Sequence, residues 1–398
     1  MKLRNNILAL AAALSIPAPL TADVFDDAVK EIVANNLSLK SSREMKLSEL
    51  ETLKSENNLE NPEVEFEHLW GPVDAGNRWS IGVSQSFEWP GVYGARKKVW
   101  KAASRAMDYL SVRERFDKVL DIRTTLIDIV NLKRNLAALS EVERTIVELL
   151  EKQQKGSRLG EVSVLDINRL RIERVGVASR VDDVRASLAS LESSLVALNG
   201  GRDCSGLIER LGTAYPNEKI LSEEEYADLI MKNDPDIAVS NSLAEAAREK
   251  VKAVRMGGFP GFSLGYVHSF EDNTHFNGFS VSVSLPFFAN RHKKKSAEAE
   301  LRAVEIEGLE KMATRKAVST GARNEALALK KSVEQYKEAV EDEDNMRLLK
   351  KAYEGGQISV TDYLQQMLYF MEAKLTYNEN LYRYNMALAR LNRYNTSY

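Results

Sequence analysis

The sequence predicts a mainly α-helical protein with a membrane β-barrel portion, built as two tandem structural repeats. Three observations lead to this prediction: matching segments recur at a nearly constant spacing, four short segments alternate apolar and polar residues, and two helical stretches are very long. Each repeat is expected to contain two transmembrane strands and a long α-helical hairpin.

The repeat is visible in pairs of matching residues. Pro62 and Pro260 each open a strand-like segment and lie 198 positions apart, and the motifs 160–166 and 356–362 lie 196 positions apart. A glycine-bearing stretch between Gly200 and Gly206 interrupts any helix there. We therefore expect a first repeat over 23–199, a linker over 200–221 and a second repeat over 222–398. The expected elements are a helix (24–57 and 222–256), strands (about 63–70 and 79–87, then about 262–270 and 279–287) and a helical hairpin (96–199 and 291–394).

The first 22 residues have the layout of a secretory signal peptide. Lys2 and Arg4 precede a short apolar run, and Thr21 and Ala22 provide small residues at a cleavage point before Asp23. No later segment approaches the ~20 consecutive apolar residues of a transmembrane helix. A membrane role would therefore depend on strands.

The four strand-like segments alternate with a period of two, which places alternate side chains on opposite faces of a sheet. Their length of roughly nine residues matches the ~9–11 residues of a tilted transmembrane strand. One face of this sheet carries apolar side chains. The other face carries serine, glycine and glutamate, as a water-filled interior requires. A small soluble sheet is the alternative interpretation. On the membrane interpretation, the lipid-facing side chains are Phe66, Trp79, Ile81, Val83, Phe262, Leu264, Tyr266, Phe279, Val281 and Val283.

Four strands are too few to close a transmembrane barrel, which needs about eight or more. An open sheet in lipid leaves backbone N–H and C=O groups without hydrogen bonds, at a cost of several kcal/mol each. The sequence therefore predicts that further copies of the chain complete the sheet.

A helical stretch of about 60 residues would be roughly 90 Å long at ~1.5 Å per residue. Such a helix needs a partner along its length, and residues spaced by three and four form a coiled-coil-like seam. The seam consists of Val119, Ile122, Leu126, Ile129, Leu132, Leu136, Leu139, Val142, Ile146 and Leu149. A rod-like scaffold is the alternative, but a plain scaffold lacks strand hairpins at one end.

Other classes of function find little support. The net charge of −3 gives no electrostatic case for nucleic-acid binding. The single cysteine, Cys204, excludes a disulfide framework, and the four histidines show no metal-ligand spacing. No nucleophile–histidine pair and no phosphate-binding glycine loop is present. We therefore expect no catalytic, cofactor-binding or metal site.

At this point the chain resembles the TolC family of outer-membrane efflux proteins over essentially its whole mature length. The most specific features are the paired Gly-x-x-Ser-x-x-Asp motifs at 160–166 and 356–362. The strand-to-helix passages at 83–87 and 283–287, each followed by basic residues, also look like the family. The resemblance implies a homotrimer whose twelve strands form one outer-membrane barrel, continued by an α-helical barrel in the periplasm of a Gram-negative bacterium.

The resemblance also implies that the two glycine motifs are helix–turn–helix tips at the constricted periplasmic entrance. The residues that map there are Gly160, Ser163, Asp166, Tyr353, Gly356, Ser359 and Asp362. Some members carry an arginine two residues after the second glycine, and here that position is Ile358. The closed entrance is therefore expected to be held differently in this protein.

The implied function is a passive exit duct of a tripartite efflux pump. Its partners would be a periplasmic adaptor (membrane fusion) protein, an inner-membrane pump and the outer-membrane lipids. A channel for type I protein secretion is an alternative, and a periplasmic coiled-coil scaffold or adaptor is an alternative from another class. The cargo, whether drugs, metals, bile salts or proteins, does not follow from the sequence.

Overall fold

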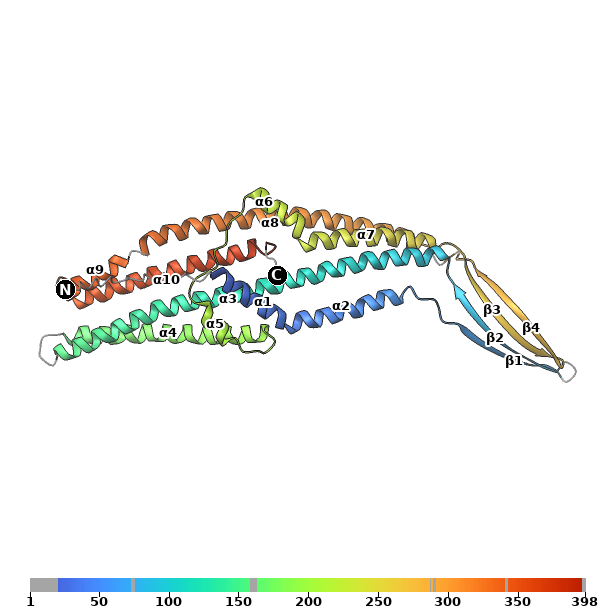
Figure 1. The fold of residues 1–398 in the computed structure, drawn as a ribbon, viewed down its shortest axis with the longest axis horizontal. Coiled ribbons are helices and arrows are strands. Elements are labelled where there is room, and N and C mark those ends of the chain that lie inside the picture. Colours follow the sequence, from blue (N-terminus) through green and yellow to red (C-terminus); the bar gives the residue numbers. More distant parts are fainter. Residues whose placement is uncertain are drawn as a thin grey trace, which may run out of the picture. The chain divides into compact units, whose positions relative to one another are not determined.

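The computed structural model describes residues 21–72, 76–157, 163–286, 288, 291–340 and 343–395 (Figure 1). The expected signal peptide lies outside the described residues except for Thr21 and Ala22, which begin the first helix. Before the second strand pair the elements are α1 (Thr21–Asn35), α2 (Leu37–Ser55), β1 (Glu63–Trp70), β2 (Asn77–Phe87), α3 (Pro90–Ser157), α4 (Val164–Leu198), α5 (Ser205–Leu211), α6 (Glu223–Asn233) and α7 (Pro235–Met256). Then follow β3 (Gly261–Glu271), β4 (Thr274–Ser284), α8 (Lys293–Val340), α9 (Glu343–Glu354) and α10 (Val360–Leu391).

The chain divides into two compact units, and long helices contribute to both. The sheet unit comprises Asn36–Leu120, Ile220–Ala326 and Arg390–Tyr398. The hairpin unit comprises Met1–Asn35, Asp121–Lys219 and Leu327–Ala389. Each unit is built from segments of both halves of the sequence, so neither half forms a unit alone.

In the sheet unit, each strand is joined to one helix. Ion pairs connect the helices in the order α2, α3, α7 and α8: Lys46 pairs with Asp108, Arg105 with Glu245, and Arg248 with Glu305. The strands follow the same order, β1–β2–β3–β4, and every neighbouring pair is antiparallel. The sheet is therefore the continuation of a row of four helices.

The register of the sheet is fixed along its whole length. Phe66 pairs with Ile81, Val83 with Tyr266, and Leu264 with Val281. A two-residue turn joins β3 to β4, and both of its residues, Asp272 (φ 46°) and Asn273 (φ 57°), have positive φ. Asp and Asn tolerate this conformation, and the turn type matches the twist of an antiparallel hairpin.

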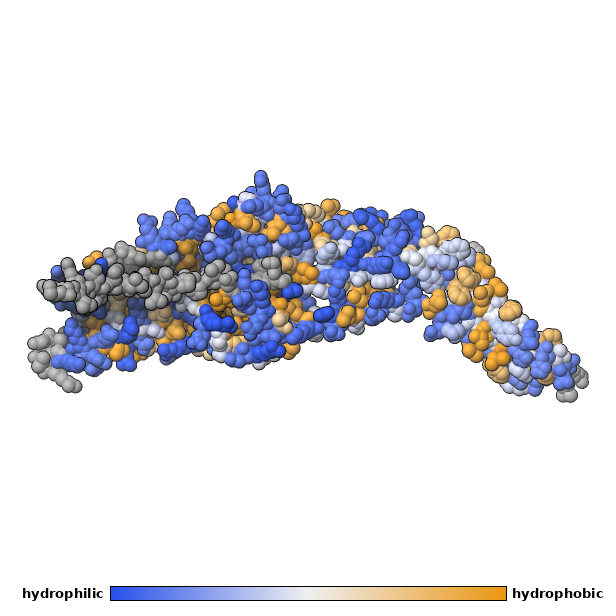
Figure 2. All heavy atoms as spheres, viewed as in Figure 1, coloured by the Kyte–Doolittle hydropathy of each residue, from blue (hydrophilic) through white to orange (hydrophobic). Residues whose placement is uncertain are grey.

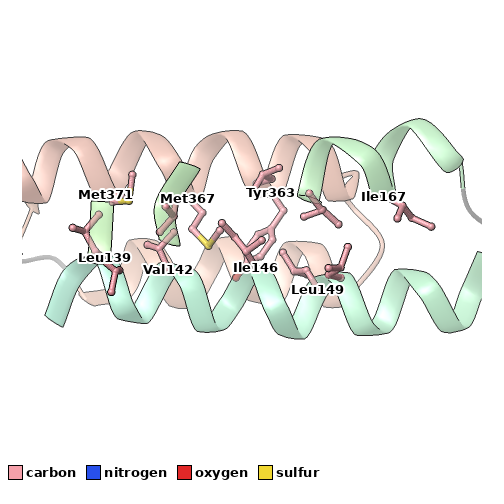
Figure 3. Close-up of a cluster of buried hydrophobic side chains, with 13 residues drawn as sticks. Leu139, Val142, Ile146, Leu149, Ile167, Tyr363, Met367 and Met371 are labelled. Carbon is pink, nitrogen blue, oxygen red and sulfur yellow. The ribbon is translucent and has the colours of Figure 1, made fainter. Parts of the chain in front are cut away.

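The hairpin unit has a continuous apolar core. Side chains of α3, α4 and α10 meet in it, as Figure 3 shows for α3 residues such as Leu139 and Ile146 and α10 residues such as Tyr363 and Met367. Ile146 and Leu364 are at most 1% exposed. Full burial of such a side chain contributes roughly 1.5–3 kcal/mol. The part of the predicted seam from Leu139 to Leu149 therefore lies in the core of this unit.

Several boundaries differ from those expected, for local reasons. The helix expected at 222–256 is two helices, because Pro235 begins α7 and Asp234 caps it. The helix expected at 24–57 is interrupted at Asn36, which caps α2 by accepting a hydrogen bond from the Leu39 N–H. The long helix begins at Pro90 instead of residue 96, since proline suits the first helical position.

The second strand of the second repeat, expected at about 279–287, spans Thr274–Ser284. The short turn at Asp272 and Asn273 lets pairing begin five residues earlier than the alternation pattern indicated. The expected linker, 200–221, contains the short helix α5, while Gly200 and Gly201 have positive φ and follow the end of α4. Among the described residues, no helix is long and apolar enough to cross a membrane.

Candidate functional site

The first candidate site is the sheet, which has one apolar face. The register places all ten side chains expected to face lipid on the same face, together with Val64, Trp70, Phe87 and Phe270. Phe279 is 89% exposed, Val281 70% and Phe66 65%. Figure 2 shows apolar side chains over the strands. Such a contiguous exposed apolar surface marks a place of contact with another molecule or with lipid.

Aromatic rings on this face contact one another across the strands. The ring centroids of Phe87 and Phe262 are 5.4 Å apart, those of Tyr266 and Phe279 are 5.8 Å apart, and those of Trp79 and Phe270 are 6.1 Å apart. These distances lie in the range of favourable aromatic pairs. Neighbouring side chains of the apolar face therefore pack against one another, although nothing in the described chain covers this face.

The opposite face is mostly small and polar. Ser80 lies opposite Glu67, Ser263 opposite Ser282, and Gly265 opposite Ser280. A Cβ at Gly265 would lie 2.5 Å from the Ser280 Oγ and 3.1 Å from the Val83 carbonyl oxygen, so any larger residue would force the Ser280 side chain and the backbone of β2 to shift. Leu69, Val267 and Phe276 are the exceptions to the polar pattern.

Both edges of the sheet are open within the described chain. β1 pairs with β2 alone, and β4 pairs with β3 alone. The outer edges of β1 and β4 thus carry backbone N–H and C=O groups available to another strand.

The second candidate site is the pair of turns at the end of the hairpin unit. Ser163 caps α4 by accepting a hydrogen bond from the Leu165 N–H at 3.2 Å. In the second turn the Ser359 hydroxyl donates to Asp362 Oδ2 at 2.6 Å, and the Asp362 N–H donates to Ser359 Oγ at 3.1 Å. Each serine therefore satisfies backbone groups at the start of a helix.

Gly356 adopts φ +71°, which favours glycine. The Gln357 N–H donates to the Ala352 carbonyl at 2.9 Å, closing the end of α9 in a Schellman arrangement. Gly160, the matching residue of the first motif, lies outside the described residues.

Tyr353 links the two hairpins near these turns. Its hydroxyl accepts a hydrogen bond from Gln153 Nε2 on α3 at 3.1 Å. Its ring stacks on Tyr363 of α10 at 4.8 Å, and the Lys152 ammonium lies 5.0 Å from the ring centroid. Desolvation raises the pKa of Tyr363, so its hydroxyl stays protonated at physiological pH.

The two turns are also joined directly. The Thr361 hydroxyl donates to Asp166 Oδ1 at 3.0 Å, across 195 residues of sequence. Ile358, where some TolC-family members have arginine, is half-buried and packs against the apolar core of the hairpin unit. The hairpins are therefore held by apolar contact and by hydrogen bonds, and Ile358 adds no charge to them.

Comparisons with known proteins bear on the fold. No family model matches the chain, and no curated protein matches it. Among solved structures, a membrane protein from Pseudomonas aeruginosa matches with a TM-score of 0.77 and 16% identity, covering 93% of this chain and 90% of that one. CusC, whose structures describe transmembrane channel formation, matches with a TM-score of 0.74 and 14% identity, covering 94% and 92%. The CmeC outer membrane channel of Campylobacter jejuni matches with a TM-score of 0.71 and 16% identity, covering 94% and 85%.

The chain has the TolC-type fold. The similarity spans nearly all of this chain and of each match, so the predicted fold, mainly helical with four antiparallel strands and long helical hairpins, is confirmed.

Within this TolC-type fold, the structure brings together several of the predicted tip residues. Tyr353 contacts both α3 and α10, and Asp166 contacts the start of α10. Ser163, Gly356, Ser359 and Asp362 build their own turns. Their part in lining an entrance stays a prediction.

Other contacts were not anticipated from sequence. Gln153 belongs to no motif, and Thr361 occupies a position that the second motif leaves unspecified, so only the packing of the hairpins reveals their contacts. His268 and His275 were dismissed because their spacing is not that of a metal site, yet β3 and β4 place their rings together. The sequence signal that could have revealed this contact is the Asp272-Asn273 turn, because it brings residues on either side of it into pairing.

Arg96, one of the basic residues after the first strand pair, forms an ion pair with Glu88.

Proposed function

We propose that this chain is the outer-membrane channel subunit of a tripartite efflux system, acting as a passive exit duct. It would assemble as a homotrimer whose three sheets close into one barrel of twelve strands. It would perform no chemical reaction. Most of the chain would lie in the periplasm.

The observation that carries this proposal is the sheet itself. It combines an exposed apolar face, a small polar face and two open edges, and its register is regular from end to end. In water, the apolar face would favour aggregation. In lipid, the open edges would each leave several unsatisfied backbone groups. A closed oligomer in a membrane satisfies both requirements at once.

Three copies suit the known size range of such barrels. Outer-membrane barrels have about eight strands or more, and twelve strands enclose a water-filled interior. The serine and glycine face would line this interior, and the apolar face would contact lipid. The similar CmeC is an outer membrane channel, and CusC forms a transmembrane channel, which supports the same assignment here.

The hairpin turns would form the periplasmic entrance and meet an adaptor protein. The helix starts capped by Ser163 and Ser359 are exposed at the ends of the hairpins, which suits contact with another coiled coil. Leu165 beside the first turn is 79% exposed and Val164 is 64% exposed, although both are apolar. The inner-membrane pump would then reach the duct through the adaptor.

Cysteine labelling tests the assigned faces. Val281 and Ser282 are neighbours on β4 that face opposite sides. In outer membranes, a water-soluble maleimide should react with a cysteine at Ser282→Cys and leave Val281→Cys unlabelled. Cys204 needs no removal, because it is 1% exposed and desolvation raises the pKa of its thiol. The opposite labelling pattern would contradict the assignment.

Deletion of the gene tests the efflux role. The expected result is greater sensitivity to at least one class of drug, dye, bile salt or metal, restored by the intact gene. A variant with a substitution in the hairpin turns should leave the barrel intact. When it replaces the deleted gene, it should assemble in the membrane but should not restore resistance. Unchanged sensitivity to all of these compounds, with protein secretion lost, would instead favour a type I secretion channel.

A further inference from the structure

Two histidines meet on the apolar face, close to the β3–β4 turn. His268 of β3 and His275 of β4 lie diagonally across the hairpin, since His268 pairs with Asn277 and His275 with Phe270. The His275 Nδ1 is 3.3 Å from the His268 Nε2, and the ring centroids are 5.3 Å apart. No other pair of histidine rings in the described chain is in contact.

The other nitrogen of His268 is held by a fixed partner. Asn277 Oδ1 lies 2.8 Å from His268 Nδ1 and also accepts a hydrogen bond from the Tyr266 hydroxyl at 2.8 Å. With the amide oxygen as acceptor, His268 Nδ1 carries the proton. The lone pair then belongs to Nε2, the atom that lies next to His275.

This arrangement matches the surroundings of histidines that bind metal ions. Such histidines almost always donate their second ring N–H to a carbonyl, a carboxylate or water, which fixes the tautomer and raises the basicity of the ligating nitrogen. Aromatic rings flank the pair: the ring centroids of Trp79 and His268 are 5.5 Å apart, and those of Phe270 and His275 are 4.9 Å apart. These neighbours restrict the positions of both imidazoles.

We propose that His268 and His275 form a binding site for a divalent transition-metal ion. Two nitrogens bound to one tetrahedral ion at ~2.0–2.1 Å lie about 3.3–3.4 Å apart, which is the separation seen here. A bound ion would replace the hydrogen bond between the two rings, and both imidazoles would rotate so that their lone pairs converge on it; His275 is exposed and His268 is half-buried. Imidazole ligands suit Zn²⁺, Ni²⁺ and Cu²⁺.

The site offers two protein ligands, so water from outside the sheet would have to complete the coordination of the ion. In the part of the chain that the structure describes, no group of three or more His, Cys, Asp or Glu side chains could hold a metal. Binding is therefore reversible and exchangeable, unlike that of a structural zinc. The inference does not depend on the channel function, which would only place the site near the loop end of the barrel.

The test uses the full chain, purified in detergent without a polyhistidine tag and titrated with NiCl₂ in a calorimeter. We expect one saturable site per chain. His268→Gln and His275→Gln should each weaken binding at least tenfold, and Asn277→Ala about tenfold or more, because loss of an outer-shell partner typically costs 10–100-fold in affinity. His68→Gln is the matched control, since His68 lies on the same face of the sheet and should leave binding unchanged.

The electron paramagnetic resonance spectrum of bound Cu²⁺ provides a second measurement. It should show two nitrogen ligands in the unchanged protein and in His68→Gln, and one in each of the two single variants. The proposal is overturned if no saturable binding is found, if a variant that carries both His268→Gln and His275→Gln binds Ni²⁺ as well as the unchanged chain, or if the copper spectrum shows fewer than two nitrogens. Loss of binding in His68→Gln alone would also overturn it.

Discussion

The hairpin unit and the four-stranded sheet treat their apolar residues in opposite ways. The hairpin unit closes its apolar seams against each other, so Ile146, Leu195 and Leu364 are at most 1% exposed. The sheet leaves its apolar residues uncovered, and Phe279, Val281 and Val283 are each more than 60% exposed. Side chains of the same kind form a core in the hairpin unit and an exposed surface on the sheet.

The difference shows what each unit requires from its surroundings. Helical hairpins satisfy their backbone hydrogen bonds internally and need only one another. A four-stranded sheet satisfies its inner strands but leaves two edges and one apolar face for other molecules. A substitution should therefore affect folding stability in the hairpin unit, and membrane assembly in the sheet.

The largest expected effect is a cavity in the hairpin core. Leu364→Ala should lower the free energy of unfolding of the hairpin unit by about 2–5 kcal/mol, because the site is fully buried between hairpins. Chemical denaturation followed by circular dichroism measures this. Leu165→Ala is the control: at 79% exposed it should change the free energy by less than about 0.5 kcal/mol. Equal effects of the two substitutions would contradict the assigned core.

A charge on the apolar face of the sheet should have the next largest effect. Val281→Lys places an ammonium group in lipid at a cost of about 2–4 kcal/mol near the middle of the bilayer, so less protein should assemble in the outer membrane. Ser282→Lys adds the same charge on the polar face and should assemble nearly normally. Quantification in isolated outer membranes measures both variants, and equal assembly would remove the distinction between the faces.

A smaller effect is expected where the hairpins meet near their turns. Tyr353→Phe keeps the ring stacked on Tyr363 but removes the acceptor for Gln153, at a cost of about 0.5–1.5 kcal/mol. If the turns form the entrance, weaker contact between the hairpins should raise the single-channel conductance in planar bilayers. Tyr369→Phe, a substitution at a 70%-exposed ring on α10, is the control and should leave conductance unchanged.

The smallest effect is expected for an exposed ion pair between α4 and α10. Arg180 Nη1 lies 2.5 Å from Glu372 Oε1, and both side chains are about half exposed. Solvent screens such pairs, so Arg180→Ala should lower the free energy of unfolding by about 0.2–1 kcal/mol, and by less at high salt. A loss as large as that of Leu364→Ala would show that the two hairpins depend on charge more than on apolar packing.

Periodicity predicted much of this fold because both periods are set by local geometry. The alternation of Phe279, Val281 and Val283 identified the correct face of β4, and the seam around Ile146 identified the core of the long helix. The start of β4 was missed because His275 and Asn277 interrupt the apolar pattern on that face. Only the turn at Asp272 and Asn273 determines where pairing begins.

The contacts at the candidate sites were less accessible from sequence. Tyr353 lies three residues before the second glycine motif, but its partner Gln153 lies 200 residues away with no motif of its own. The contact between His268 and His275 follows from strand register, and a search for metal-ligand spacing along the chain cannot detect it. Contacts between residues that meet only through packing can be found only in the structure. The apolar faces of strands and the apolar seams of helices, by contrast, follow from the sequence.

The central claim is that one chain supplies a third of a closed sheet. Native mass spectrometry of the mature protein released from outer membranes in mild detergent tests this most directly. We predict a single species of three chains, which dissociates only when the detergent or heat disrupts the sheet. A stable monomer that remains soluble in buffer without detergent would contradict the claim.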